Sequence, residues 1–374
     1  MQKTQLLFQR TLIFFFIVIL STDLSSQEAT DNPVRIGVVG LVHTHVHWIL
    51  GREASDDLEI VGIVEPNREL AKRYSQQHGY SMDIVFDTME EMIAKTQPEA
   101  VTAFNTIYDH LEVVKVCAPK GIHIMVEKPL AVSLDHAKQM ADLARKHKVM
   151  LLTNYETTWY ATNHKLYEWV HNEQKLGDIR KMVVHDGHRG PAEIGVNKEF
   201  LEWLIDPKWN GAGALTDFGC YGANLMTWMM QGEAPLTVTA ITQTMKPERN
   251  PLVDDEATII LTYPKAQGII QASWNWHISR KDMEIYGKNS AAVAKNRSEM
   301  TLRLSDNDPL EAYTLEERKA PLNDPFSYFA AMIRGQLQYD ANSLSSLENN
   351  MVVMRILDAA MRSAEKGKTV KLKD

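Results

Sequence analysis

The chain has 374 residues, of which 44% are hydrophobic and 24% charged, and its formal net charge is −8. This length and balance predict a globular protein with two domains, each large enough for its own core. The negative charge and the lack of a basic run argue against nucleic acid as a partner, because phosphate binding needs clustered Lys and Arg.

The first residues have the parts of a secretory signal peptide. Lys3 and Arg10 precede an apolar run from Leu12 to Leu20, and the small polar segment 21–26 follows. We expect residues 1–26 to be cleaved, residues 27–33 to form a linker, and the mature protein to be periplasmic or secreted. Nine apolar residues are too few to span a bilayer, so no stable membrane anchor is expected.

From Val34 to Thr153 the sequence alternates between strand and helix patterns. The expected strands are 34–39, 58–64, 100–103, 122–126 and 149–153, and the expected helices are 45–54, 67–78, 109–118 and 133–146. Strands separated by helices predict a parallel sheet with helices on both faces. We therefore assign residues 34–153 to a doubly wound, Rossmann-type domain.

A lysine follows the buried strand 122–126. Pro129 forces Lys128 into an extended conformation just past the end of this strand. In an open parallel sheet, ligands bind at the carboxyl ends of the strands. Lys128 is therefore a candidate catalytic residue, and the alternative is a solvated lysine in a strand-to-helix loop.

The first strand is followed by a degenerate dinucleotide-binding fingerprint. G-x-G-x-x-G counted from Gly40 would place glycines at positions 42 and 45, where this chain has Val42 and His45. The backbone amides of residues 43–45 could still bind an anion at the start of a helix. Glu65 closes the second strand, where a carboxylate accepts the ribose hydroxyls, which favours NAD. Arg68 leaves NADP possible.

Three histidines in this loop raise the question of a metal site. On a helix His43 and His47 would share one face and His45 would point away. No carboxylate or cysteine lies at ligand spacing beside them. We favour a structural or phosphate-contacting role over metal binding, and expect no metal.

After Asn154 the pattern changes. A helix is expected at 163–173, strands at 179–184, 236–243, 257–263 and 268–274 without helices between them, and a helix at 343–364. Strands in direct succession favour antiparallel pairing. The acidic run 254–256 is typical of a solvated turn.

Several stretches resemble the Gfo/Idh/MocA family of oxidoreductases. They are Glu127-Lys-Pro-Leu-Ala131, Lys175-Leu-Gly-Asp-Ile-Arg180, Gly211-Ala-Gly-Ala-Leu-Thr-Asp-Phe-Gly-Cys-Tyr221 and Ala360-Met-Arg-Ser-Ala-Glu-Lys-Gly-Lys-Thr-Val370. The resemblance implies a Rossmann domain, then an α+β domain (154–374) with a large, mostly antiparallel sheet that binds the substrate and forms a homo-oligomer. It also implies a nicotinamide between the domains and a cis peptide bond between Lys128 and Pro129.

The chain departs from the family pattern at three places. The fingerprint is degenerate, Thr106-Ile107 replaces Pro-Asn before His110, and Tyr221 replaces the histidine of Asp-x-Gly-x-His. A tyrosine there resembles the branch of glucose-fructose oxidoreductase and dihydrodiol dehydrogenase. The residues expected to bind the cofactor are Gly40, Val42, His43, Thr44, His45, Glu65, Asn105, Thr106, His110 and Glu127.

Asp217, Tyr221 and Asn224 recur at helical spacing. A solvated helix face would explain this stripe, but the family match places it in the cleft. We expect Tyr221 to be the acid/base for a sugar hydroxyl, with a pKa lowered by Lys128, and Asp217 to fix the sugar or the lysine.

The substrate is expected to be a small sugar or polyol. Side chains that can donate in several directions follow the strand 179–184, and an indole can stack on a sugar face. The expected substrate contacts are His185, His188, Arg189, Trp209 and Asn224.

Three functions remain open from the sequence. The first is an oxidoreductase for a sugar or cyclitol that keeps NAD(P) tightly bound, because free nicotinamide cofactor is not expected outside the cytoplasm. The second is an NAD-dependent glycosidase or lyase that passes through a transient 3-keto sugar. The third is a cofactor-free descendant that only binds sugars.

Overall fold

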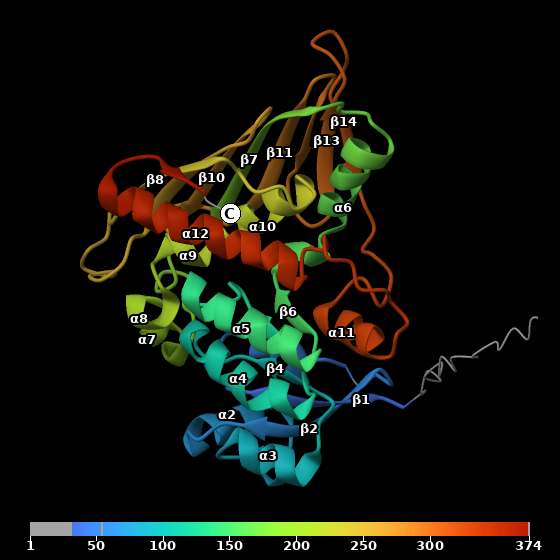
Figure 1. Cartoon of the computed structure of the whole chain (residues 1–374), viewed down its shortest axis with the longest axis vertical. Helices are drawn as coiled ribbons and strands as arrows, with labels where there is room; N and C mark the ends of the chain where they lie inside the picture. Colours follow the sequence, from blue (N-terminus) through green and yellow to red (C-terminus); the bar gives the residue numbers. More distant parts are fainter. Residues whose placement is uncertain (1–31, 54, 373–374) are drawn as a thin grey trace, which may run out of the picture.

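The structure is a computed structural model that describes residues 32–53 and 55–372. The predicted signal peptide and all but the last two residues of the predicted linker lie outside the described residues. The described residues form two sheets, of six and nine strands. Figure 1 shows one sheet above the other, with helix α12 (Leu347–Lys366) between them, where it contacts both domains.

The first sheet is the predicted Rossmann sheet. All its strands are parallel, in the order β3-β2-β1-β4-β5-β6. They are β1 (Val34–Val39), β2 (Leu58–Val64), β3 (Val85–Phe86), β4 (Ala100–Ala103), β5 (His123–Glu127) and β6 (Leu151–Asn154). Its helices are α1 (Val46–Leu50), α2 (Arg68–His78), α3 (Met89–Thr96), α4 (His110–Cys117) and α5 (Leu134–His147). The short strand β3 and helix α3 were not predicted.

Local signals explain where these helices begin and end. The Ser133 hydroxyl accepts the backbone N–H of His136 at the start of α5, and the helix ends at Lys148 in the left-handed region (φ 55°). Helix α1 is shorter than predicted, because residues 43–45 form a turn and Gly51 follows the last helical residue. This turn brings its side chains to the edge of the sheet.

The second sheet is mostly antiparallel, as the resemblance implied. Its order is β14-β13-β12-β11-β7-β10-β9-β8-β15, and only β7 and β10 pair in parallel among the described strands. The strands are β7 (Ile179–Gly187), β8 (Thr237–Gln243), β9 (Glu256–Thr262), β10 (Gln267–Ser273), β11 (Arg280–Gly287), β12 (Ala291–Ala294), β13 (Glu299–Arg303), β14 (Glu311–Thr314) and β15 (Val370–Lys371). Strands β11 to β15 were not predicted.

The helices that pack on this sheet are α6 (Ala161–Tyr167), followed by one π-helical turn (Glu168–Asn172), α9 (Ala214–Asp217), α10 (Gly219–Met229) and α12. Helices α7 (Lys198–Leu204) and α8 (Pro207–Asn210) pack against each other, and α8 also contacts the turn before α4. Helix α11 (Pro325–Ile333) contacts β2 of the first sheet. Every residue of α10 is buried, between the sheet and α12. Within the described residues, no helix has the length and apolar character to cross a membrane.

The acidic run 254–256 is not the solvated turn that was predicted. Asp255 is fully buried, and its carboxylate accepts the backbone N–H groups of Met245 (2.7 Å) and Lys246 (2.8 Å). The Asp254 carboxylate accepts the N–H groups of Gly213 (2.9 Å) and Leu215 (2.7 Å). Asp254 thus holds the loop that leads into α9, and Asp255 holds the loop that follows β8.

Candidate active site

A buried ion pair joins the two domains. Lys128 lies directly after β5, its peptide bond to Pro129 is cis, and its ammonium donates to both the carboxylate and the backbone carbonyl (3.0 Å) of Asp217. The other carboxylate oxygen of Asp217 accepts the indole N–H of Trp274 (2.9 Å). Two of the predicted catalytic residues, one from each domain, are therefore in contact.

The third predicted catalytic residue, Tyr221, lies beside this pair, one turn along the chain on α10. The Lys128 Nζ atom is 5.2 Å from the Tyr221 ring centroid, and the Lys281 Nζ atom is 4.7 Å from it. The phenol has no hydrogen-bond partner among the described residues. Lys128, Asp217 and Tyr221 line one cavity of about 470 Å³ between the domains.

Burial and charge set the protonation of these groups. Burial acts to lower the pKa of Lys128, but the negative charge of Asp217 outweighs it and the pKa is raised. Burial acts to raise the pKa of Asp217, but the positive charge of Lys128 outweighs this effect and the pKa of Asp217 is lowered. The pair is thus an ammonium and a carboxylate.

The expected lowering of the Tyr221 pKa by Lys128 is wrong for the protein alone. Burial raises the pKa of Tyr221 well above its ordinary value, and the Glu156 carboxylate adds to this effect. The phenol is therefore neutral and can donate a proton.

A second ion pair in the cavity was missed by the sequence analysis. Lys281, from β11, donates to the carboxylate of Glu156, which also accepts the Tyr160 hydroxyl (2.6 Å). Burial acts to raise the pKa of Glu156, but Lys281 outweighs it and lowers this pKa to about 2. Glu156 stands two residues after β6, so the argument that selected Lys128 would have selected it too.

Behind the cavity lies a carboxyl group that was also missed. Asp186 is fully buried on β7, directly opposite Lys281 on β11, and neither carboxyl oxygen has a partner among the described residues. Burial raises the pKa of Asp186 well above its ordinary value, so the group is a neutral acid.

Of the predicted substrate contacts, only His188 lines the cavity. Its Nδ1 atom accepts the backbone N–H of Gly190 (3.0 Å), and burial lowers its pKa to about 4. The imidazole is therefore neutral at pH 7, which leaves its Nε2 atom as a hydrogen-bond donor.

The other four predicted substrate contacts are not brought to the cavity. His185 faces the opposite side of the sheet from Asp186, where its Nδ1 atom meets the Asp282 carboxylate (2.9 Å). Asn224 is fully buried and donates to the Leu344 carbonyl (2.8 Å). Arg189 is exposed and its carbonyl accepts the ammonium of Lys246 (2.6 Å), while the Trp209 ring packs against Tyr108 (5.4 Å between centroids).

The carboxyl edge of the Rossmann sheet carries the predicted cofactor residues. Gly40 has φ +80°, and a Cβ there would lie 2.8 Å from the backbone of Asn105. Glu65 is buried at the end of β2, and its two oxygens accept the backbone N–H groups of Leu41 (3.0 Å) and Asn67 (2.9 Å). Its remaining lone pairs are the acceptors available to a ribose.

Buried polar atoms without partners gather at this edge. Among the described residues, no hydrogen bond is made by His43 Nε2, Thr44 Oγ1 or Asn105 Oδ1. Because buried polar atoms are normally paired, these three indicate a polar ligand.

The remaining predicted cofactor residues have other contacts. Thr106 caps the turn before α4, His110 is buried with Nδ1 at the Leu130 carbonyl (3.1 Å), and Val42 is half-buried against the core. Neither Thr106 nor His110 lines the cavity.

Helix α7 of the second domain covers the histidine loop. The His43 ring packs edge-on against Phe200 (4.9 Å between centroids) and lies 5.7 Å from Trp203. Glu199 binds Arg73 and the Tyr74 hydroxyl (2.6 Å) on α2. A dinucleotide that lies along this edge must therefore pass beneath α7 or displace it.

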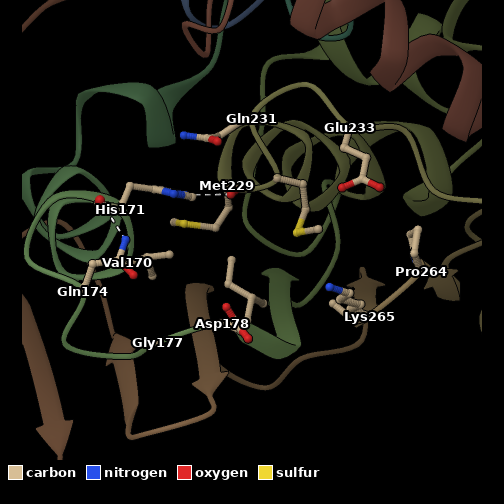
Figure 2. A pocket seen from close by; sticks show the side chains of 13 residues that line it. Val170, His171, Gln174, Gly177, Asp178, Met229, Gln231, Glu233, Pro264 and Lys265 are labelled. Atoms are coloured by element: carbon tan, nitrogen blue, oxygen red, sulfur yellow. Dashed lines mark hydrogen bonds between the residues drawn. The ribbon is translucent and has the colours of Figure 1, made fainter.

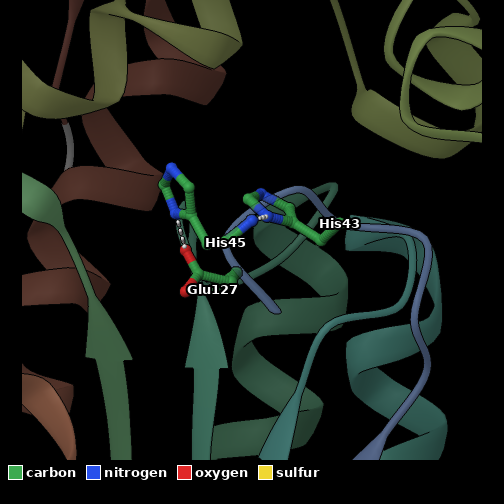
Figure 3. Close-up of side chains that lie close together, drawn as sticks. All are labelled: His43, His45 and Glu127. Atoms are coloured by element: carbon green, nitrogen blue, oxygen red, sulfur yellow. Dashed lines mark hydrogen bonds and ion pairs between the residues drawn. The ribbon is translucent and has the colours of Figure 1, made fainter. Parts of the chain in front are cut away.

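His43, His45 and Glu127 lie together in Figure 3, contrary to the expectation that His45 points away and that no carboxylate is near. The reason is that α1 begins only at Val46, and the chain brings Glu127 from β5 to the same edge. His45 Nδ1 is 2.8 Å from Glu127 Oε2, and His43 Nδ1 accepts the His45 N–H (3.1 Å). These side chains could hold a metal ion.

A separate hollow of about 420 Å³ lies at the other end of the second domain. Figure 2 shows its titratable side chains, among them His171, whose Nε2 atom is 2.9 Å from the Met229 carbonyl. None of the predicted site residues lines this hollow.

Comparison with known families gives two consecutive matches that together cover more than half of the chain. Residues 34–155 match the model described as oxidoreductase family, NAD-binding Rossmann fold. Residues 164–293 match the model of the GFO/IDH/MocA C-terminal domain.

Among curated proteins, the chain is 27% identical over 219 residues to trans-1,2-dihydrobenzene-1,2-diol dehydrogenase of Xenopus tropicalis, a match that spans 58% of this chain and 61% of that enzyme. It is 22% identical over 360 residues to D-xylose 1-dehydrogenase [NADP(+)] of Haloarcula marismortui, which covers 94% of this chain and 96% of that enzyme. A D-glucoside 3-dehydrogenase of Escherichia coli is 25% identical over 218 residues, 56% of this chain and 58% of that enzyme.

Among solved structures, aldose-aldose oxidoreductase from Caulobacter crescentus has the same fold, with a TM-score of 0.75 at 20% identity over 91% of this chain and 100% of that one. An inositol dehydrogenase homolog from Azotobacter vinelandii gives a TM-score of 0.78 at 16% identity over 91% of this chain and 97% of that one. The chain therefore belongs to the Gfo/Idh/MocA family of oxidoreductases, with an NAD-binding Rossmann domain followed by the C-terminal domain of that family.

Proposed function

We propose that this protein is an NAD(P)-dependent oxidoreductase that acts on a hydroxyl group of a sugar or cyclitol and keeps its cofactor bound. The observation that carries the proposal is the meeting of Lys128, Asp217 and Tyr221 in one cavity at the carboxyl edge of the Rossmann sheet. The relatives named as sugar dehydrogenases support this choice of substrate.

The residues at the cofactor edge fit a dinucleotide. Gly40 leaves room for a backbone turn, Glu65 supplies acceptors for ribose hydroxyls, and the unpaired atoms of His43, Thr44 and Asn105 require polar partners. Glu199 on α7 binds Arg73 and Tyr74 on α2, and these contacts hold α7 over the histidine loop, which supports tight retention.

When bound, the nicotinamide would supply the hydride acceptor or donor. The protein's own part is the proton. In the direction of ketone reduction, the neutral Tyr221 hydroxyl donates its proton to the substrate oxygen, and the Lys128 ammonium stabilises the phenolate that remains. In the reverse direction, that phenolate takes the proton back from the sugar hydroxyl.

A cofactor-free sugar-binding protein is the second candidate. It is favoured by the packing of Phe200 and Trp203 against His43, one of the residues that would hold the cofactor. Mass spectrometry of the small molecules released when the purified protein is denatured separates the two candidates. We expect NAD or NADP in near-stoichiometric amount.

Absorbance near 340 nm after addition of a sugar then tests the reaction. A lasting rise from bound NADH or NADPH is expected. Release of a product without net redox change would instead indicate the glycosidase or lyase reaction. A protein that neither contains nor binds a nucleotide would overturn the oxidoreductase proposal.

We also infer export and self-association. Residues 1–26 have the pattern of a cleaved signal peptide, and the open outer face of the nine-stranded sheet offers a surface for a second copy. Cell fractionation, N-terminal sequencing of the mature protein and light scattering test these inferences.

A further inference from the structure

A second cavity lies directly beside the catalytic one. It has a volume of about 320 Å³, within the ~300–1,000 Å³ that small-molecule sites occupy. Glu156 lines both cavities. Asn296 lines the first cavity and the adjacent Arg297 lines the second, so the same chain segments form the wall between them.

The second cavity presents an aromatic face. Trp48 is 37% exposed, although indoles are usually covered, and one side of its ring stacks on His45 (3.8 Å between centroids, 15° between planes). His45 in turn lines the catalytic cavity. A flat aromatic surface therefore lies next to the cavity that holds Lys128 and Tyr221.

Polar groups surround this face. Arg297 and Glu317 form a half-exposed ion pair (3.5 Å), and both line the cavity. The Asn323 Oδ1 atom is buried there without a partner among the described residues. An aromatic plane bordered by a carboxylate, a guanidinium and an amide suits a ring with C–H groups on its faces and hydroxyls at its edge.

We propose that this cavity is a second carbohydrate subsite, which binds the neighbouring ring of a disaccharide or larger glycoside while the ring to be oxidised lies at Lys128 and Tyr221. The inference rests on the proposed function and narrows its substrate class from free monosaccharides to glycosides. Trp48 and Glu317 are the specificity-determining residues.

The test compares kcat/KM of the holoenzyme for cellobiose and maltose with kcat/KM for methyl glucoside. Wild type should prefer at least one disaccharide. In Trp48→Ala the disaccharide-to-methyl-glucoside ratio should fall about 10-fold, as expected for loss of an aromatic contact. Trp48→Phe should restore most of the wild-type ratio. Glu317→Gln should lower the ratio. Tyr286→Ala, which removes a similarly exposed ring (41%) on β11, outside both cavities, should leave this ratio unchanged.

Calorimetry of disaccharide binding keeps the test independent of turnover. If wild type oxidises neither class of sugar but binds a disaccharide more weakly after Trp48→Ala, the proposed reaction fails and the subsite stands. If the ratio and the dissociation constant are both unchanged by Trp48→Ala and Glu317→Gln, the subsite is rejected, whatever the reaction.

Discussion

The ammonium of Lys128 and the carboxylate of Asp217 bind each other across the boundary between the Rossmann domain and the substrate domain. Both side chains are only 6% exposed, so each charge depends on the other. Removing one partner of a buried pair typically costs about 3–5 kcal/mol.

Asp217→Asn tests this dependence. The amide keeps an oxygen for the Trp274 indole but loses the charge that raises the pKa of Lys128. Burial then dominates and the folded-state pKa falls below the unfolded value of about 10.4, so the variant loses stability as pH falls below about 10. We expect the variant's deficit in free energy of unfolding to shrink between pH 7 and pH 10 in urea titrations. A deficit that is constant with pH would contradict the conclusion that the charge of Asp217 raises the pKa of Lys128.

Tyr221→Phe should abolish most of the activity and leave the fold intact. Loss of a positioned acid/base group costs about 100- to 10,000-fold in rate. The Tyr221 hydroxyl has no partner among the described residues, so its removal should change the melting temperature little. Tyr263→Phe is the matched control, because it removes another buried hydroxyl without a partner, outside the cavity. Equal activities of the two variants would remove Tyr221 from the mechanism.

Helix α7 should control the exchange of the cofactor. Glu199→Ala breaks the contacts with Arg73 and Tyr74. The hydrogen bond from the Tyr74 hydroxyl to the charged carboxylate contributes about 1.5–3 kcal/mol, and the ion pair with the exposed Arg73 adds about 0.2–1 kcal/mol. We expect NAD release, followed by fluorescence, to become at least about 10-fold faster. Glu202→Ala on the same helix removes only an exposed ion pair with Lys198 and should leave the rate unchanged. No acceleration by Glu199→Ala would show that α7 does not retain the cofactor.

The sequence predicted those site residues whose position follows from local geometry. Lys128 was found because a buried strand and a proline fix its place at the sheet edge. Asp217 and Tyr221 were found because helical spacing puts them on one side and the family resemblance places that side in the cleft. The same spacing wrongly placed Asn224 in the site. Every residue of α10 is buried, so the spacing of its polar residues does not show which of them face the cavity and which face the core.

Other residues depended on long-range pairing that periodicity does not show. His185 and Asp186 are neighbours, and only the register of β7 against β11 decides that Asp186 faces the cavity side. Lys281 was missed because β11 was missed. The ring that packs on His43 belongs to Phe200, more than 150 positions away, so the sequence of the histidine loop alone could not predict this contact.

The stability of the protein should fall in mild acid. Burial lowers the pKa of His110 to about 4, well below its ordinary value of 6.5. Between these two values the unfolded chain binds a proton that the folded chain does not, so stability is fully present above pH 6.5 and is lost as pH falls towards 4. One pKa unit corresponds to ~1.4 kcal/mol, so this histidine alone accounts for a loss on the order of 3 kcal/mol. His164 and His188 act in the same direction.

His110→Asn should flatten this dependence. Urea unfolding measured from pH 7 to pH 4.5 should give a smaller decrease in unfolding free energy for the variant than for wild type. His277→Asn, at an exposed position, should reproduce the wild-type slope. The comparison uses the slope and not the absolute stability, because replacing the buried His110 ring also removes packing and the contact with the Leu130 carbonyl. Equal slopes for His110→Asn and wild type would show that His110 takes up its proton while the protein is still folded.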